Sequence, residues 1–282
     1  MSEQAKTGST GEPHRHVRFL PREHGATAML MTPMVCVAIL ARQWRWCEFA
    51  TLTAAFAALA AKDPLVVLAR QRLVWKQRHP ETAIAMKWFA GWLLLLLLSG
   101  LVLMTSWTLQ ATVALGLGVG VFSALAIAVN LKNRQRSTLF QIASAAALTS
   151  SSLAACLSAT GAIAPWCWWL WLLMAMQATA GILVVHARLD ARIAARSASP
   201  ASEQFRRAAY VALGVLLCAA VFAAILRRGW IALALLTAVM GYAYDLRRQR
   251  DTEALQTPLK KVGQRALALS SLFAGLLILG FW

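Results

Sequence analysis

The sequence predicts an all-α polytopic membrane protein with nine transmembrane helices, and three observations support this fold class. Of the 282 residues, 59% are hydrophobic and only 14% are charged, whereas soluble domains carry about a quarter charged residues. The apolar residues come in runs long enough to cross a bilayer, which takes about 20 residues of helix. The 12 Trp against three Tyr also suit a membrane protein, because Trp anchors helix ends at the interface.

Nine apolar runs along the chain are candidate spans, and the first and the eighth are the shortest. The stretch before them, residues 1–20, is polar and lacks the apolar core of a signal peptide. We therefore expect a disordered polar tail at 1–20, followed by one nine-helix transmembrane domain at 21–282. The candidate spans are 25–41, 48–69, 84–106, 109–131, 138–158, 165–187, 207–226, 230–244 and 263–282.

The basic residues predict how the helices are oriented. Cytoplasmic loops of membrane proteins are enriched in Lys and Arg, and 23 of the 28 basic residues lie in the N-terminal tail, in the loops after the second, fourth, sixth and eighth spans, or in the span ends next to these loops. Only Arg42, Arg45, Arg227 and Arg228 lie in the other loops. This distribution predicts a multi-pass plasma (inner) membrane protein with a cytoplasmic N-terminus and an outside C-terminus. It also accounts for the net charge of +17 without a nucleic-acid partner.

Polar side chains collect at the predicted cytoplasmic ends of the spans. Ten of the 11 acidic residues lie on that side, and long loops on one face often carry function. His186 and Asp190 are four residues apart and share a helix face, so we expect a hydrogen-bonded pair. Lys62 and Asp63 are adjacent and point in different directions on a helix, so a simple ion pair is not expected there.

Two further groups of residues lie within or beside the apolar runs. Buried amides need hydrogen-bond partners, so Gln141 and Gln264 either bridge helices or contact a ligand. The five cysteines form no CxxC pair, and we interpret all of them as small apolar filler.

One motif at the entry to the first span is familiar. Residues 21–30 read PREHGATAML, which resembles the N-terminal signature of the YwiC-like membrane protein family, roughly PREHGAWAML. Thr27 stands where that family usually has Trp. Residues 257–265, TPLKKVGQR, also resemble the last cytoplasmic loop of that family.

A more distant resemblance, in layout more than in identity, is to the UbiA-type intramembrane prenyltransferases. It comprises nine helices in a UbiA-like bundle, polar clusters at the ends of the second and sixth spans, and the segment from Lys132 to Gln141. Those enzymes hold Mg²⁺ and a prenyl diphosphate with the motifs NDxxDxxxD and DxxxD. Here the first motif keeps only Asp63, and the second has His186 and Asp190. Mg²⁺ requires oxygen ligands, and the two isolated carboxylates that remain are a poor substitute for the full motifs. We therefore expect no metal ligands, and a Mg²⁺ cofactor is not expected.

These observations predict that the protein binds an anionic amphiphile, such as a prenyl diphosphate, in a cytoplasmic-facing cavity. Arg and Lys can neutralise a phosphate without a metal, so a catalytic version would transfer prenyl or related alkyl groups with cations in place of Mg²⁺. The alternative is a non-enzymatic relative that acts as a transporter, lipid-binding protein or assembly factor. The expected partners are membrane lipids. The candidate binding residues are Arg22, His24, Lys62, Asp63, Arg70, Arg134, His186, Arg188 and Asp190.

The charge distribution makes a testable prediction of topology. Reporter fusions at Gln77, Ser199 and Thr252 should read cytoplasmic, and fusions after Trp107 and Gly161 should read outside. The reason is the concentration of Lys and Arg in alternate loops. A cytoplasmic signal after Trp107 or Gly161 would contradict this orientation.

Overall fold

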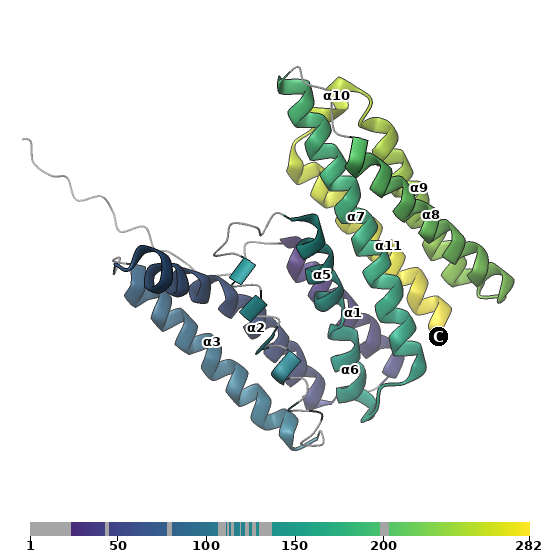
Figure 1. Ribbon diagram of the computed structural model, residues 1–282. Coiled ribbons are helices and arrows are strands. Elements are labelled where there is room, and N and C mark those ends of the chain that lie inside the picture. The colour runs from purple at the N-terminus through teal and green to yellow at the C-terminus, as the bar shows by residue number, and fades with distance from the viewer. Residues whose placement is uncertain are drawn as a thin grey trace, which may run out of the picture.

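The computed structural model describes residues 24–42, 45–77, 81–106, 137–197 and 203–282, with scattered positions between 111 and 129. Within this part of the chain the secondary structure is helical, without strands. The helices are α1 (His24–Ala41), α2 (Trp46–Arg70), the π-helical η1 (Gln71–Trp75), α3 (Glu81–Met104), α5 (Thr138–Thr149), α6 (Ser151–Thr160), α7 (Pro165–Ser197), α8 (Glu203–Ile225), α9 (Gly229–Arg248), α10 (Thr252–Leu255) and α11 (Leu259–Phe281) (Figure 1).

The described helices confirm an all-helical polytopic membrane protein. Seven of them are long and apolar enough to cross a membrane, and α1 is a shorter apolar helix. Together they coincide with eight of the nine predicted spans. The remaining span, 109–131, lies mostly outside the described residues, as does the predicted tail at 1–20. The number of nine spans, the orientation and the tail therefore stay predictions.

Helix α7 lies at the centre of the larger part of the bundle. It packs against α1, α5, α6, α8, α9 and α11, while α2 and α3 form a pair that joins the bundle through α1 and α6 (Figure 1). Small side chains occupy many of the buried contact positions, among them Ala180, Ala209, Ala234 and Ala238. Small residues let helix backbones approach closely, which is how helices associate in a membrane.

The predicted span 138–158 is one membrane crossing made of two helices, α5 and α6, with a turn at Ser150. Hydroxyl groups cause the break. Thr149 Oγ1 donates to the Ala145 carbonyl (2.9 Å) and Ser150 Oγ to the Ala147 carbonyl (2.7 Å), and such bonds compete with the helical ladder and bend helices. Ser151 Oγ donates instead to the Leu30 carbonyl on α1 (2.7 Å). The turn therefore ties α6 to α1.

The helices α1 and α11 run in the same direction along α7. At their C-terminal ends, the guanidinium of Arg42 lies 3.9 Å from the ring centroid of Trp282. The ring of Phe281 lies 6.5 Å from that of Trp166, near the start of α7. The ends of α1 and α11 therefore lie at the same end of the bundle as the start of α7. The starts of α1 and α11 lie at the other end, together with the end of α7. We call this the basic end, because Arg188, Arg192 and Arg196 of α7 and Lys260 and Lys261 of α11 lie there.

A disulfide corrects the interpretation of the cysteines as filler. Cys156 on α6 and Cys167 on α7 are bonded to each other across the loop between the two helices. Both side chains are fully buried, and the two positions are 11 residues apart in sequence, so spacing alone did not mark them as a pair. Cys36, Cys47 and Cys218 are free.

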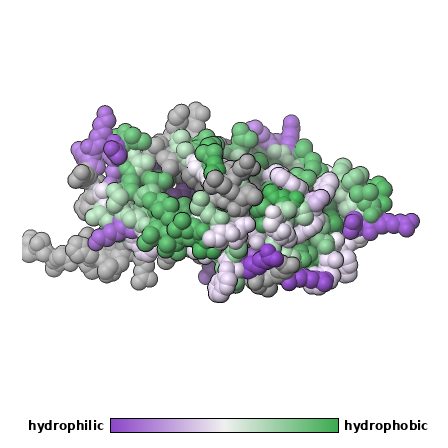
Figure 2. Space-filling model, turned by 90° about the horizontal axis from the view of Figure 1, so that it is seen from below, coloured by the Kyte–Doolittle hydropathy of each residue, from purple (hydrophilic) through white to green (hydrophobic). Residues whose placement is uncertain are grey.

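The outer surface fits a lipid environment. Large apolar side chains are exposed along α3, where Leu94, Leu97 and Leu101 are examples, and along α8, where Val211 and Phe222 are examples. Figure 2 views the molecule from below and shows apolar residues over much of this face, with hydrophilic residues in separate patches towards its edges.

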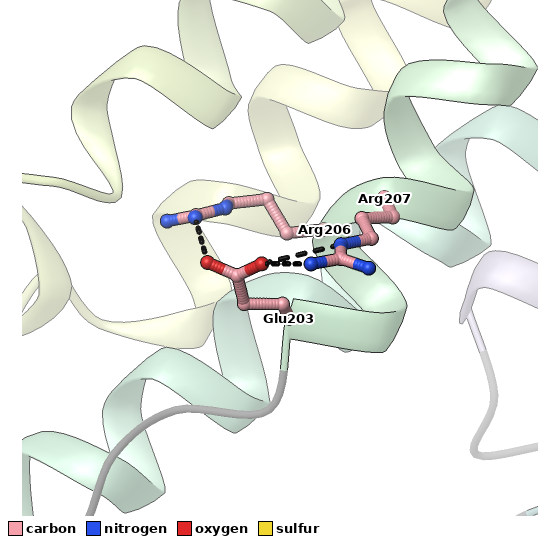
Figure 3. A network of polar contacts seen from close by, with 3 residues as sticks. All are labelled: Glu203, Arg206 and Arg207. Carbon is pink, nitrogen blue, oxygen red and sulfur yellow. Dashed lines mark hydrogen bonds and ion pairs between the residues drawn. The ribbon is translucent and has the colours of Figure 1, made fainter.

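The start of α8 shows how charge is arranged at the basic end. Glu203 stands in the first turn, where a helix favours negative charge. Its two carboxylate oxygens accept from Arg206 (2.9 Å) and Arg207 (2.6 Å) one turn later (Figure 3). The group is exposed, so it orders the helix terminus more than it stabilises the fold.

Candidate functional site

A cavity of about 540 Å³ lies between α1, α7 and α11, and the end of α5 completes it. In Figure 1 these three helices lie next to one another. Its mostly apolar lining with a few polar groups is typical of small-molecule sites. The lining residues are Gly25, Ala28, Met29, Thr32, Pro33, Thr149, Met174, Gln177, Ala178, Lys260, Gly263, Gln264, Ala266, Leu267, Ser270 and Phe273.

The cavity is polar near the basic end and closed by apolar side chains further in. Lys260 and Gln264 are four residues apart on the first turns of α11 and belong to the outer part of the lining. Deeper along the same helix come Leu267 and Ser270, and the buried ring of Phe273 follows. A ligand in this space would meet charge and amide groups first and hydrocarbon afterwards.

Helical spacing and side-chain size together explain why a cavity forms here. The lining positions of α11 recur every three or four residues, so they form one face of that helix. The facing positions of α1 include Gly25, Ala28 and Thr32, whose small side chains leave space where larger ones would fill the gap. The first two belong to the motif at 21–30.

The inner part of the cavity holds a buried amide with defined partners. Gln177, in the middle of α7, is 6% exposed. Its Nε2 donates to Tyr242 Oη on α9 (2.7 Å) and to Ser270 Oγ on α11 (2.9 Å). Tyr242 Oη in turn donates to the backbone carbonyl of Gln177 (3.2 Å). One side chain therefore links α7, α9 and α11 in the membrane interior.

Several predicted binding residues lie at or beyond the limits of the described structure. Arg22 and Arg134 lie outside the described residues, and of His24 only the backbone is described, at the first position of α1. The neighbouring Gly25 lines the cavity. The motif at 21–30 thus leads directly into the cavity wall.

Three predicted residues lie on α2, away from the cavity lining. They are Lys62, Asp63 and Arg70. The expectation that Lys62 and Asp63 make no ion pair was wrong, because Lys62 Nζ lies 4.0 Å from Asp63 Oδ1. The long Lys side chain can reach back over the helix surface, although the two Cβ atoms point apart. Because α2 packs on α1, α3 and α6, the structure gathers these residues on a different side of α1 from α7.

The predicted residues on α7 make contacts other than the expected ones. His186 Nε2 lies 2.8 Å from Gln141 Oε1 on α5, and its ring stacks on Phe205 of α8 with centroids 5.2 Å apart. The predicted pairing with Asp190 was wrong, and Asp190 Oδ2 is buried without a hydrogen-bond partner among the described residues. Of the two alternatives for Gln141, the bridge between helices is confirmed. Gln264, by contrast, lines the cavity.

Arg188 fastens the segment before α11 to α7. It is 6% exposed, and its Nη2 donates to the Ala254 carbonyl in α10 (2.5 Å). Nearby, Gln249 Nε2 donates to the Val184 carbonyl (3.1 Å). Asp245 on α9 interacts electrostatically with Arg188. These contacts hold the basic end of α9, α10 and α7 together, and α11 begins directly after them.

Thr32, Gln177 and Ser270 were not among the predicted site residues, and Lys260 was noted only as a loop charge and as part of the segment 257–265. Gln177 carried a usable signal, because it interrupts an apolar run near the centre of a span. A polar residue at that depth is a functional-site hypothesis by default. Thr32 and Ser270 carried no comparable signal, since hydroxyl groups can bond to their own helix.

The comparisons with known proteins find a family model that is similar to the N-terminal part of the chain. A model of the YwiC-like protein family matches residues 20–157, which confirms the resemblance predicted from the motif at 21–30. No curated protein and no solved structure matches the chain. The resemblance to UbiA-type prenyltransferases is not borne out by these comparisons.

The packing around the Gln177 network predicts a stability difference between two glycine substitutions. A Cβ on Gly181 would lie 2.7 Å from Tyr242 Oη, whereas a Cβ on Gly214 would meet nothing within 4 Å. Gly181→Ala should lower the melting temperature in detergent, because overpacking of about 1–3 kcal/mol exceeds the helix-propensity gain of about 1 kcal/mol. Gly214→Ala, the control, should melt at or above the wild-type temperature. Equal melting of Gly181→Ala and wild type would contradict this packing.

Proposed function

We propose that this integral membrane protein binds an amphiphile with an anionic head group in the cavity between α1, α7 and α11. The observation that carries the proposal is that Gly25, Ala28 and Met29, from the family motif, form one wall of this cavity. The opposite wall begins at Lys260 on α11. Motif residues that line a cavity indicate ligand binding more directly than motif residues that only pack between helices.

The lining matches the two parts of such a ligand. An apolar chain would lie against Met29, Leu267 and Phe273, and the head would stay near Lys260 and Gln264. A Lys ammonium is a common partner of phosphate groups. The sequence before α1 carries further cations, Arg22 among them.

The proposal shifts the centre of the site from the ends of α2 and α7 to the starts of α1 and α11. Arg22 and His24 stay candidates for the head group because they precede Gly25 closely in the sequence. A head-group role remains a prediction for the other candidates, since the lining does not include them. They are Lys62, Asp63, Arg70, Arg134, His186, Arg188 and Asp190.

Two features support a cavity that faces the cytoplasm of a plasma membrane. Its polar part lies at the basic end, which the enrichment of Lys and Arg assigns to the cytoplasm. The Cys156–Cys167 disulfide lies towards the other end, and disulfides persist in oxidising compartments outside the cytoplasm. Both features favour a cytoplasmic N-terminus.

The same cavity serves either of two activities. A catalytic protein would transfer a prenyl or related alkyl group, with Lys and Arg neutralising the diphosphate. A non-enzymatic protein would carry, present or sense the lipid. Both require that the head group bind by cations, so the first experiment addresses binding.

Titration of the purified protein in detergent with farnesyl diphosphate, with and without EDTA, tests the proposal. We expect the affinity to change little with EDTA. Lys260→Gln should weaken binding about fivefold, the equivalent of about 1 kcal/mol for a partly exposed charge pair. Lys261→Gln is the matched control, because Lys261 is adjacent and exposed but does not line the cavity.

Three results would change the interpretation. Loss of all binding with EDTA would mean that a metal holds the head group. Absence of binding in both conditions would remove prenyl diphosphates as ligands and favour the non-enzymatic alternative. Equal effects of Lys260→Gln and Lys261→Gln would move the head group away from this cavity.

A further inference from the structure

We infer that Gln177 selects the ligand's tail: its side-chain carbonyl is an acceptor inside the cavity, fit for an amphiphile whose tail carries a hydroxyl or another hydrogen-bond donor. This inference rests on the proposed function and adds a substrate class to it. A hydrocarbon tail, a prenyl tail included, would leave the acceptor without a partner.

The orientation of the amide follows from its neighbours. Tyr242 Oη donates its one proton to the backbone carbonyl of Gln177 (3.2 Å). In this arrangement the Tyr242 oxygen accepts from the Gln177 side chain, whose Nε2 lies on that side (2.7 Å). The second N–H of the amide points to Ser270 Oγ (2.9 Å). Both donors of Gln177 are thereby used within the protein.

The remaining polar atom is Oε1. No hydrogen bond to it is recorded among the described residues, and Gln177 itself lines the cavity. The side chain is 6% exposed. Some polar atoms among the described residues are both fully buried and unpaired, but Oε1 is not one of them, so it keeps some exposed surface. The oxygen is therefore accessible, and the accessible space beside Gln177 is the cavity.

The depth of this acceptor separates it from the head-group region. Ser270, which binds the Gln177 amide, follows Lys260 by ten residues on α11, or about 15 Å at 1.5 Å per residue. A polar group so far from the basic end does not serve the head. It fits a donor on the tail, at a depth where bulk water is scarce and an unmet acceptor is costly.

Three synthetic probes with one head group test the inference. They are dodecyl phosphate, 12-hydroxydodecyl phosphate and 12-methoxydodecyl phosphate, whose extended chains are about as long as the 15 Å separation. The hydroxyl probe can donate, the methoxy probe can only accept, and the plain probe does neither. Their dissociation constants are measured for the full-length protein in a neutral detergent.

The wild-type protein should bind the hydroxyl probe about two- to tenfold more tightly than dodecyl phosphate, the range for one net hydrogen bond. The methoxy probe should gain nothing. Gln177→Leu should bring the ratio of the hydroxyl and plain affinities to about one, and this ratio is compared within the variant, so it does not depend on how far the variant weakens binding of dodecyl phosphate itself. The control Gln141→Leu removes another helix-bridging amide, outside the cavity, and should keep the preference.

The outcomes separate this inference from the proposed function. Equal wild-type affinity for all three probes would overturn the inference and leave the proposed function intact, and this comparison needs no variant to fold. Methoxy binding as tight as hydroxyl binding would show that Gln177 presents its N–H groups, which also overturns it. A hydroxyl preference that survives Gln177→Leu would assign the acceptor elsewhere. Failure of all three probes to bind would remove the proposed function and the inference together.

Discussion

A buried amide in the middle of a membrane helix has to be hydrogen-bonded, and the arrangement of α7, α9 and α11 meets this requirement. The two N–H groups of the Gln177 side chain are satisfied by Tyr242 and Ser270, at a depth where an unpaired amide costs about 2–7 kcal/mol. Sliding either partner helix by one turn would break a bond that water cannot replace. The network therefore fixes the axial position of α11, and with it the position of Lys260 beside the start of α1.

With α11 held in this axial position, small residues on α1 leave space between the two helices. On α1, Gly25, Ala28 and Thr32 face α11 without filling the gap, whereas on α7 a contact such as Gly181 against Tyr242 brings two helices close together. Small side chains thus have opposite effects at two helix contacts. Between α7 and α9 it allows tight packing, and between α1 and α11 it creates the cavity. The contacts of Arg188 and Gln249 with backbone carbonyls anchor the segment that leads into α11.

Much of the fold could be predicted from the sequence, because a bilayer imposes a length and a polarity on every span. Eight apolar helices lie where the hydropathy pattern put them. The break at Ser150 and the disulfide between Cys156 and Cys167 could not be predicted, since both depend on which helix faces which.

The predicted site residues and the cavity lining have no described residue in common, although His24 directly precedes the lining residue Gly25 at the start of α1. Charge at helix ends drew attention to α2 and to the end of α7, and the structure uses His186 and Arg188 there to join helices. Gln177 is uncharged, and what distinguishes it from other polar residues of the chain is its burial in the middle of a span.

The central claim is that an anionic amphiphile occupies the cavity between α1, α7 and α11. Native mass spectrometry of gently purified protein, followed by lipid extraction, tests it most directly. Wild type should carry a bound anionic lipid. Ala28→Phe, which fills the cavity, should lose it, and Val35→Phe, on an exposed position of the same helix, should keep it. A wild-type protein without bound lipid, or an Ala28→Phe variant that retains the same lipid, would contradict the claim.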